Sequence, residues 1–244
     1  MRIESRHSAL AYFPDFDGFW QPHDWASSEK QIRAQLPTHW ATEWTPHSVE
    51  ILTQLARAHG LMGDLLNAQA TLSQAQQMLS SSKVDMGSRA EVRWLLEQGR
   101  VHYLGMSPIK AHDLFVQAWT LASENGLHFF AVDAALMLST VRPPKFQNEW
   151  LQKALILAEA SSDEKVRLWL THLLFLEGWH AFDFRQFDRS LHCFEQAMVQ
   201  PGANTDSLRV MAMHWSRGRA MRALGQIENA LALQQSLLAD MNSN

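Results

Sequence analysis

Two His-Asp pairs are the side chains best suited to metal chemistry in this 244-residue sequence: His23-Asp24 and His112-Asp113. A metal ion that activates water for hydrolysis needs ligands from several places in the chain, because a single pair cannot hold the ion. His112-Asp113 falls in a predicted helix, on a face that is usually partly solvated. We therefore predict no metal ligands and no cofactor, and keep metal-dependent hydrolysis as a remote alternative.

Cys193 is the single cysteine, so an internal disulfide is impossible, and its neighbour is His192. Adjacent residues of a helix point about 100° apart, which places His192 poorly for activating the thiol. We predict that Cys193 is a small buried residue. The sequence also lacks a Gly-rich phosphate loop and a nucleophile elbow. These observations together predict a protein that is not an enzyme.

The composition is that of a folded protein, with 46% hydrophobic and 19% charged residues. A net charge of -4 gives no basic excess for binding nucleic acid or an anionic membrane. Residues 1–13 lack the long apolar core of a signal peptide, and no run approaches the roughly 18 apolar residues of a membrane span. We expect a cytoplasmic protein without nucleic-acid or membrane partners.

A pattern of small and bulky residues recurs five times along the chain. Each copy begins with a small anchor residue: Ala56, Gly99, Ala135, Gly178 and Gly218. Sixteen residues after each anchor stand Leu72, Phe115, Leu151, Phe194 and Gln234. Twelve and nineteen residues after the anchor, most copies have another small residue, as at Ala68 and Ala75. The pattern departs at Gln147, which is large, and weakens in the fifth copy at Gln234 and Leu237.

Small residues at this spacing predict pairs of closely packed helices. Two helices approach to about 8–10 Å only where the contacting side chains are small. Breaks at Gly63-Asp64, Ser107-Pro108 and Pro143-Pro144 separate the two helices of a pair. Each pair leaves an apolar face uncovered, so it must stack on the next pair. The sequence therefore predicts an all-α solenoid, with no signs of strands.

The pattern resembles the tetratricopeptide repeat (TPR), whose motif has small residues at these offsets. The anchors stand 36 to 43 residues apart, which resembles the long-helix TPR variety of bacterial regulators and kinesin light chains. The stretches "LLEQGRVHYLG", "LAEASSD" and "RALGQIENALALQ" also resemble a bacterial family of stand-alone long-repeat TPR proteins. The resemblance implies a right-handed α-α superhelix, a TPR-like solenoid of about five helical hairpins.

Three regions follow from this assignment. Residues 1–46 form an irregular arm with a short capping helix, "SEKQIRAQL", for the first repeat. Residues 47–241 form the solenoid of five helix pairs, and residues 242–244 form a tail.

The TPR resemblance also implies a concave groove lined by the first helix of each pair. The predicted peptide-binding residues are Arg57, Arg93, Arg100, Tyr103, Phe175, Trp179, Phe182, Trp215, Arg219 and Arg222. Arginine binds carboxylates through two hydrogen bonds, and Trp and Tyr provide rigid contact area. A protein or peptide partner with acidic ends and an apolar centre would complement this groove. The leading function is therefore a non-catalytic scaffold for protein interactions.

Three alternatives stay open. In the first, the arginines pair with Asp or Glu of this chain, and Trp179 and Trp215 are core residues. The groove belongs to a regulatory sensor that binds a small ligand or signalling peptide. The His-Asp pairs, which resemble the motif of HD-type phosphohydrolases, belong to a metal-dependent hydrolase.

The C-terminal hairpin predicts self-association. Its second helix, expected at about 226–241, has more apolar residues than one face of a surface helix needs. Solenoids normally end in a capping element with a polar outer side, and the sequence shows none after this helix. We therefore predict a homodimer through a two-fold contact of the C-terminal hairpin.

Overall fold

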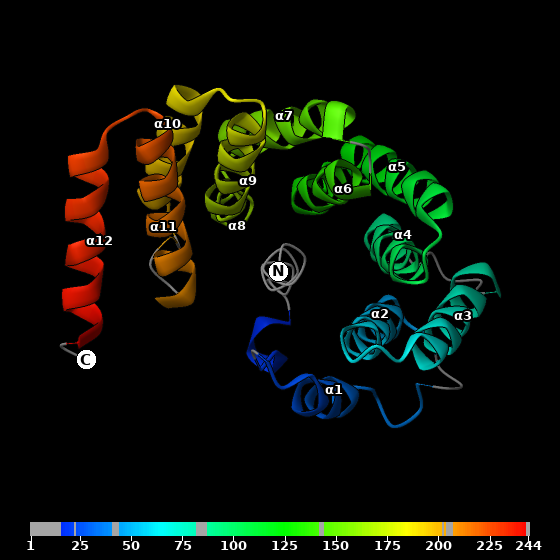
Figure 1. The fold of residues 1–244 in the computed structure, drawn as a ribbon. Helices are drawn as coiled ribbons and strands as arrows, with labels where there is room; N and C mark the ends of the chain where they lie inside the picture. Colours follow the sequence, from blue (N-terminus) through cyan, green and yellow to red (C-terminus); the bar gives the residue numbers. More distant parts are fainter. Residues whose placement is uncertain are drawn as a thin grey trace. The chain divides into compact units, whose positions relative to one another are not determined.

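The computed structural model describes residues 16–21, 23–40, 44–81, 87–141, 144–201, 203 and 207–242. Within these residues the chain is helical and has no strands, which confirms the all-α prediction (Figure 1). A short 3-10 helix at Asp17–Phe19 precedes the α-helices. The α-helices are α1 (Trp25–Arg33), α2 (Pro46–Leu61), α3 (Leu65–Ser81), α4 (Gly87–Leu104), α5 (Pro108–Glu124), α6 (His128–Val141), α7 (Pro144–Ala160), α8 (Glu164–Arg167), α9 (Trp169–Asp183), α10 (Phe187–Met198), α11 (Ser207–Ala223) and α12 (Ile227–Asn242).

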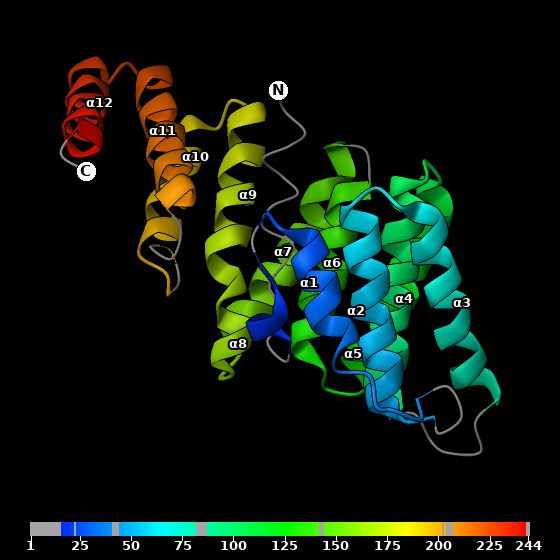
Figure 2. The same ribbon diagram turned by 90° about the horizontal axis from the view of Figure 1, so that it is seen from below.

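The chain forms two compact units, residues 1–143 and residues 144–244. In the first unit α2 packs with α3, α4 packs with α5, and α1 lies against α2 (Figures 1 and 2). In the second unit α9 packs with α10, α11 packs with α12, and α7 lies against α9. The third predicted helix pair consists of α6 and α7, which belong to different units. The predicted division into arm, solenoid and tail stays a prediction, and residues 1–15 of the arm and 243–244 of the tail lie outside the described residues.

Helix starts follow the local sequence. Thr45 precedes Pro46, the first residue of α2, and the Thr45 hydroxyl accepts a hydrogen bond from the backbone N–H of Ser48. Asp24 caps α1 in the same way by accepting from the N–H of Ser27. The capping helix therefore begins at Trp25, three residues before the predicted "SEKQIRAQL".

Two of the anchors, Gly99 and Gly178, lie at tight contacts between paired helices. A Cβ atom built on Gly99 would lie 2.5 Å from the ring of Phe115, sixteen residues later. A Cβ atom on Gly178 would lie 2.5 Å from the ring of Phe194. Glycine is therefore required where the bulky residue is phenylalanine. In the first pair the bulky residue is the smaller Leu72, and the anchor is alanine.

The turns between paired helices end in a left-handed residue seven positions after the anchor. This residue is Gly63 (φ 78°) in the first pair and Gly225 (φ 77°) in the fifth. Met106 (φ 59°) and Arg185 (φ 60°) adopt the same conformation in the second and fourth pairs. A side chain disfavours this region because Cβ approaches the following carbonyl oxygen, at a cost of roughly 1–2 kcal/mol.

We expect glycine at positions 106 and 185 to stabilise the protein. Both side chains are exposed, so Met106→Gly and Arg185→Gly remove backbone strain and lose little packing. Glycine also raises the entropy of the unfolded chain, which offsets part of this effect. Each variant should therefore raise the free energy of unfolding by about 0.5–1 kcal/mol. The urea midpoint measures it. Gly63→Ala is the matched control and should lower the midpoint; a lower midpoint for Arg185→Gly would contradict the prediction.

Candidate functional site

In the first unit the predicted groove arginines lie in buried ion pairs. Arg93 is almost fully buried, and its Nε lies 3.1 Å from Oε2 of Glu50. The same carboxylate accepts two hydrogen bonds of 2.8 Å from Arg89. The guanidinium of Arg93 also contacts two rings, 5.1 Å from the centroid of Phe16 and 4.9 Å from that of Phe130. This cluster joins the N-terminal segment to α2, α4 and α6.

A second buried cluster joins α2, α4 and α6 through Glu97. Its Oε1 accepts hydrogen bonds from Arg57 at 3.4 Å and from Arg100 at 2.6 Å. Arg100 also donates to Oδ1 of Asp133, a fully buried residue of α6, at 2.5 Å. Burial and the charge of Arg100 lower the pKa of Arg57 to about 10, so Arg57 remains charged at neutral pH.

These contacts give Arg57, Arg93 and Arg100 a role in helix packing. Their predicted role in peptide binding stays a prediction, as does that of the half-buried Tyr103 on α4. One surface shared by the arginines of both units also stays a prediction.

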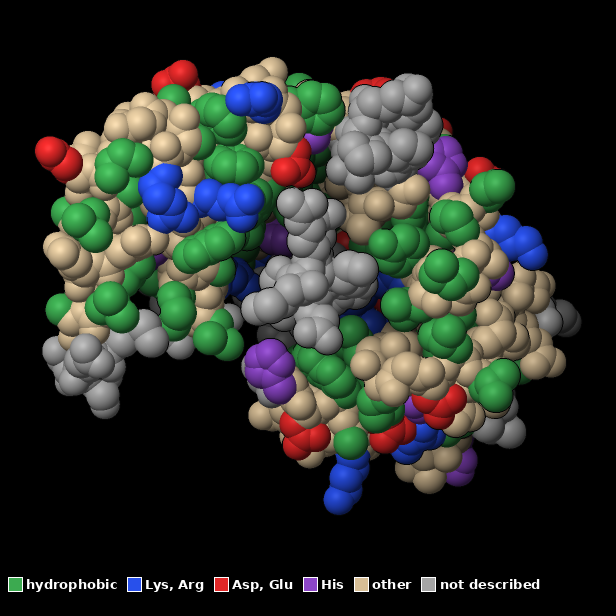
Figure 3. All heavy atoms as spheres, in the orientation of Figure 1, with side chains coloured by type: hydrophobic (Ala, Val, Ile, Leu, Met, Phe, Trp, Pro, Cys, Tyr) green, Lys and Arg blue, Asp and Glu red, His purple; other side chains and the backbone are tan. Residues whose placement is uncertain are grey.

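In the second unit the predicted residues lie on adjacent faces of α9 and α11. Phe175, Trp179 and Phe182 follow one another on α9 at spacings of four and three residues. The same spacings on α11 give Trp215, Arg219 and Arg222. Because three- and four-residue steps return to one helix face, each trio forms a single stripe. Figure 3 shows hydrophobic and basic side chains side by side over α9 and α11. We call these six residues the α9–α11 face.

The aromatic rings of this face contact one another. Trp179 lies 5.6 Å from Phe182 and 5.9 Å from Trp215, measured between ring centroids. Trp215 is 47% exposed, whereas Trp179 is half-buried. Trp179 also contacts Phe194, the bulky residue of the same helix pair, at 5.5 Å. The face is thus supported by the core of its own helix pair and reaches the surface at Trp215.

Arg219 lies on these rings. Its guanidinium carbon is 5.1 Å from the ring centroid of Phe182, 5.4 Å from Trp215 and 5.6 Å from Trp179. Cation–π contacts of this kind stabilise the charge of the guanidinium without using its N–H groups as donors to an acidic side chain. Among the described residues, no acidic side chain forms an ion pair with Arg219. The guanidinium of Arg219 is therefore chemically suited to a carboxylate from another molecule.

All the Arg, Lys, Asp and Glu residues of α11 are of one sign, positive. The helix carries four arginines and no Asp or Glu. Arg217 donates to Oε1 of Glu195 at 3.2 Å, while Arg222 is exposed. Near the start of α11, burial and the positive charge of Arg209 lower the pKa of His172 to about 4. His172 on α9 is therefore neutral at pH 7, and its ring adds no charge to this region.

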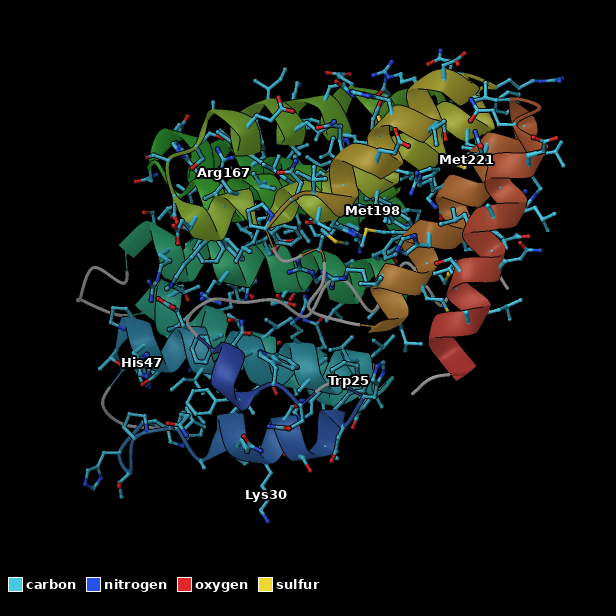
Figure 4. All side chains as sticks on the ribbon, turned by 90° about the vertical axis from the view of Figure 1, so that its left-hand side faces the viewer. Trp25, Lys30, His47, Arg167, Met198 and Met221 are labelled. Carbon is cyan, nitrogen blue, oxygen red and sulfur yellow. The ribbon has the colours of Figure 1, made fainter. Side chains whose placement is uncertain are left out.

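A shallow cleft of about 310 Å³ lies elsewhere in the second unit. Leu170 and Leu174 provide its apolar lining. Its polar lining comes from Glu159, Arg167 (labelled in Figure 4), His192, Gln196 and Gln200. Its residues do not include the α9–α11 face. A small-ligand sensor role stays a prediction.

The structure also places the residues that the sequence suggested for metal or thiol chemistry, the two His-Asp pairs and Cys193. Asp24 caps α1, and Nδ1 of His112 lies 3.3 Å from the exposed Asp113. In the ranges that the structure describes, no three His, Cys, Asp or Glu side chains group to hold a metal ion. Cys193 is buried, as predicted, and burial together with the charge of Glu177 raises the pKa of its thiol.

The sequence left open that the arginines pair with Asp or Glu of this chain, but it did not identify which acidic residues these are. Glu97 and Asp133 each stand two residues before an anchor, Gly99 and Ala135. Arginines stand one residue after the anchors of the first and second pairs. This recurrence could have indicated the ion pairs, because positions near the anchors of neighbouring helix pairs lie close together in a stacked repeat.

The structure is similar to solved helical-repeat proteins. One is BtubC (BKLC) from P. vanneervenii, with a TM-score of 0.68, 15% sequence identity and 91% of each chain covered. Another is a kinesin-light-chain-like protein of Podosopora anserina with nearly identical TPR-like repeats, with a TM-score of 0.57, 17% identity, and 81% of this chain and 96% of that chain covered. A variant form of that fungal protein gives a TM-score of 0.56 at the same identity, with 80% and 94% covered.

No family model matches the sequence, and no curated protein matches it either. The structural similarity shows the fold, which is all-α and TPR-like, as predicted. Within the described residues, no helix has the length and apolar character needed to cross a membrane.

Proposed function

We propose that this protein is a non-catalytic scaffold that binds a peptide or an extended protein segment on the α9–α11 face. TPR-like repeats commonly serve as scaffolds for protein interactions, but folds of this kind host many functions. The proposal therefore rests on one observation of this chain: Arg219 lies on three aromatic rings with no acidic partner among the described residues.

The chemistry of the face supports a partner with carboxylates beside apolar side chains. Trp215 offers exposed aromatic area, and tryptophan and arginine contribute strongly to binding at protein interfaces. Arg219 and the exposed Arg222 offer hydrogen bonds to carboxylates. A cytoplasmic location is part of this proposal, and the single buried cysteine supports it.

The proposal also includes self-association through the C-terminal hairpin. Large apolar side chains are exposed on both of its helices: Leu208, Met211 and Trp215 on α11, and Ile227, Leu231 and Leu238 on α12. Exposed apolar surface of this kind is typical of a protein interface.

Peptide binding can be tested with a designed probe. Fluorescein-labelled EEDLLLDEE should bind and raise the fluorescence anisotropy, whereas QQNLLLNQQ should bind more weakly because it lacks carboxylates. Trp215→Ala and Arg222→Glu should each weaken binding by about tenfold. Arg167→Glu lies outside the face and serves as the matched charge control. Equal binding of the two peptides, or no binding of EEDLLLDEE, would count against the proposed partner chemistry.

A further inference from the structure

An ion-pair rule connects neighbouring helix pairs in the first unit. Arg57 stands one residue after the first anchor and binds Glu97, which stands two residues before the second anchor. Arg100 stands one residue after the second anchor and binds Asp133, two residues before the third. In each case an arginine of one pair has a carboxylate partner on the helix stacked against it, and Arg100 also donates to Glu97 of its own helix. These ion pairs are buried, so they help to define how one helix seats on the next.

Arg219 occupies the same repeat position in the fifth pair, one residue after Gly218. Within the described part of the chain, no acidic side chain forms an ion pair with it. The position two residues before the same anchor is Ser216, so the pair provides no carboxylate of its own there. In the first unit the two corresponding arginines each have a carboxylate partner on a neighbouring helix, so the corresponding source for Arg219 is a helix packed against α11.

We infer that a second copy of the chain supplies this carboxylate from α12, through Glu228. The inference rests on the proposed self-association and identifies the residues that would recognise the partner. Glu228 is exposed and lies in the first turn of α12. This helix carries two acidic residues and no Lys or Arg, whereas α11 carries four arginines and no acidic residue. The two helices of the hairpin are therefore complementary in charge.

A two-fold contact places these groups together. If α12 of the second copy lies antiparallel to α11, its first turn reaches the C-terminal half of α11, where Arg219 and Arg222 lie. Leu231 and Leu238 then run toward Met211 and Leu208 near the start of α11. Two-fold symmetry repeats every such contact, so in each copy the α11 arginines contact α12 of the partner copy and α12 contacts the partner's α11 arginines. The arrangement covers the exposed apolar side chains of both helices, Trp215 included, together with Arg219 and Arg222. The dimer contact therefore uses part of the α9–α11 face, and the second copy and the peptide of the proposed function compete for it.

Sedimentation equilibrium at micromolar concentration tests the inference on the full chain. Wild-type protein should dimerise, and Arg219→Glu and Glu228→Lys should each raise the dimer dissociation constant by about tenfold or more. The double variant Arg219→Glu/Glu228→Arg restores opposite charges in both symmetry-related contacts and should recover most of the lost affinity. Arg167→Glu and Glu164→Lys provide matched charge controls in the second unit and should leave dimerisation unchanged. The urea midpoint of each variant verifies folding. If Arg219→Glu fails to fold, Glu228→Lys still tests the contact, because Glu228 is exposed and its replacement should not disturb the fold.

The outcomes distinguish the Arg219–Glu228 contact from the proposed self-association on which it rests. A monomeric wild-type protein would overturn self-association, and the assigned contact with it. A wild-type dimer that Glu228→Lys does not weaken would overturn only the assigned contact. Weakening by both single variants without recovery in the double variant would also overturn the Arg219–Glu228 pairing. Recovery in the double variant would support it.

Discussion

Replacing Asp133 with leucine is expected to lower the free energy of unfolding of the first unit by about 3–5 kcal/mol. Asp133 is fully buried, and its carboxylate accepts a hydrogen bond of 2.5 Å from Arg100. Without Asp133, the cluster holds two arginines and one carboxylate, Glu97, so one positive charge loses its buried counter-charge. Removing one member of a buried ion pair costs more than the net contribution of the pair, because the remaining charge stays out of water.

The double variant Arg100→Met/Asp133→Leu should recover most of this loss. It removes one charge of each sign and leaves Arg57 with Glu97, whose side chains already lie 3.4 Å apart. Urea unfolding followed by circular dichroism measures all variants. Asp113→Leu is the control, because the Asp113 side chain is 67% exposed and should change stability by less than about 0.5 kcal/mol. If Asp133→Leu unfolds at the wild-type midpoint, the buried pair does not stabilise the unit.

Replacing Gly178 with alanine is expected to destabilise the second unit by about 1–3 kcal/mol or more. The new Cβ atom would lie 2.5 Å and 2.6 Å from two ring carbons of Phe194, a fully buried side chain. The ring cannot move freely because Phe175 and Trp179 pack against it. In contrast, Gly218→Ala meets its nearest atom, in Leu233, at 3.7 Å, an ordinary contact. This control should leave stability unchanged or raise it, since alanine favours the helix interior by about 1 kcal/mol.

Phe194→Leu should rescue Gly178→Ala. The double variant copies the combination that the first pair uses, Ala56 with Leu72, both fully buried. Phe194→Leu alone leaves a cavity and should cost about 1 kcal/mol or more. The loss in the double variant should be smaller than the sum of the two single losses by at least about 1 kcal/mol, as measured by urea midpoints. Strict additivity would show that the two positions do not share a contact.

The sequence was sufficient to predict four of the helix pairs, α2 with α3, α4 with α5, α9 with α10 and α11 with α12, because the contacts of a helix pair constrain residue size. Gly99 accompanies Phe115 and Ala56 accompanies Leu72, so the sum of the two volumes is similar in both pairs. This compensation is visible in a single sequence, since both residues stand at a fixed spacing. It identifies the helix pairs without any knowledge of what covers them.

Burial of the groove positions could not be predicted in the same way. Arg93 and Arg219 both stand at positions that the repeat assigns to the concave side. Phe16, from the N-terminal segment, lies over the guanidinium of the buried Arg93, whereas the aromatic contacts of Arg219 among the described residues come from α9 and α11. What covers a face depends on contacts between distant parts of the chain, and residue spacing alone does not specify these contacts. The division of the chain between α6 and α7 was not predicted for the same reason.

The contact between Trp179 and Trp215 also has an optical consequence. Two indole rings with centroids 5.9 Å apart and planes inclined by 33° couple their electronic transitions. Such a pair produces an exciton couplet in the circular dichroism spectrum, which isolated tryptophans do not give. Subtracting the spectrum of Trp215→Phe from that of the wild type isolates this couplet from the other tryptophans of the chain. Any molecule that separates or reorients the two rings will change its amplitude, so the protein carries an intrinsic optical reporter within its candidate binding face.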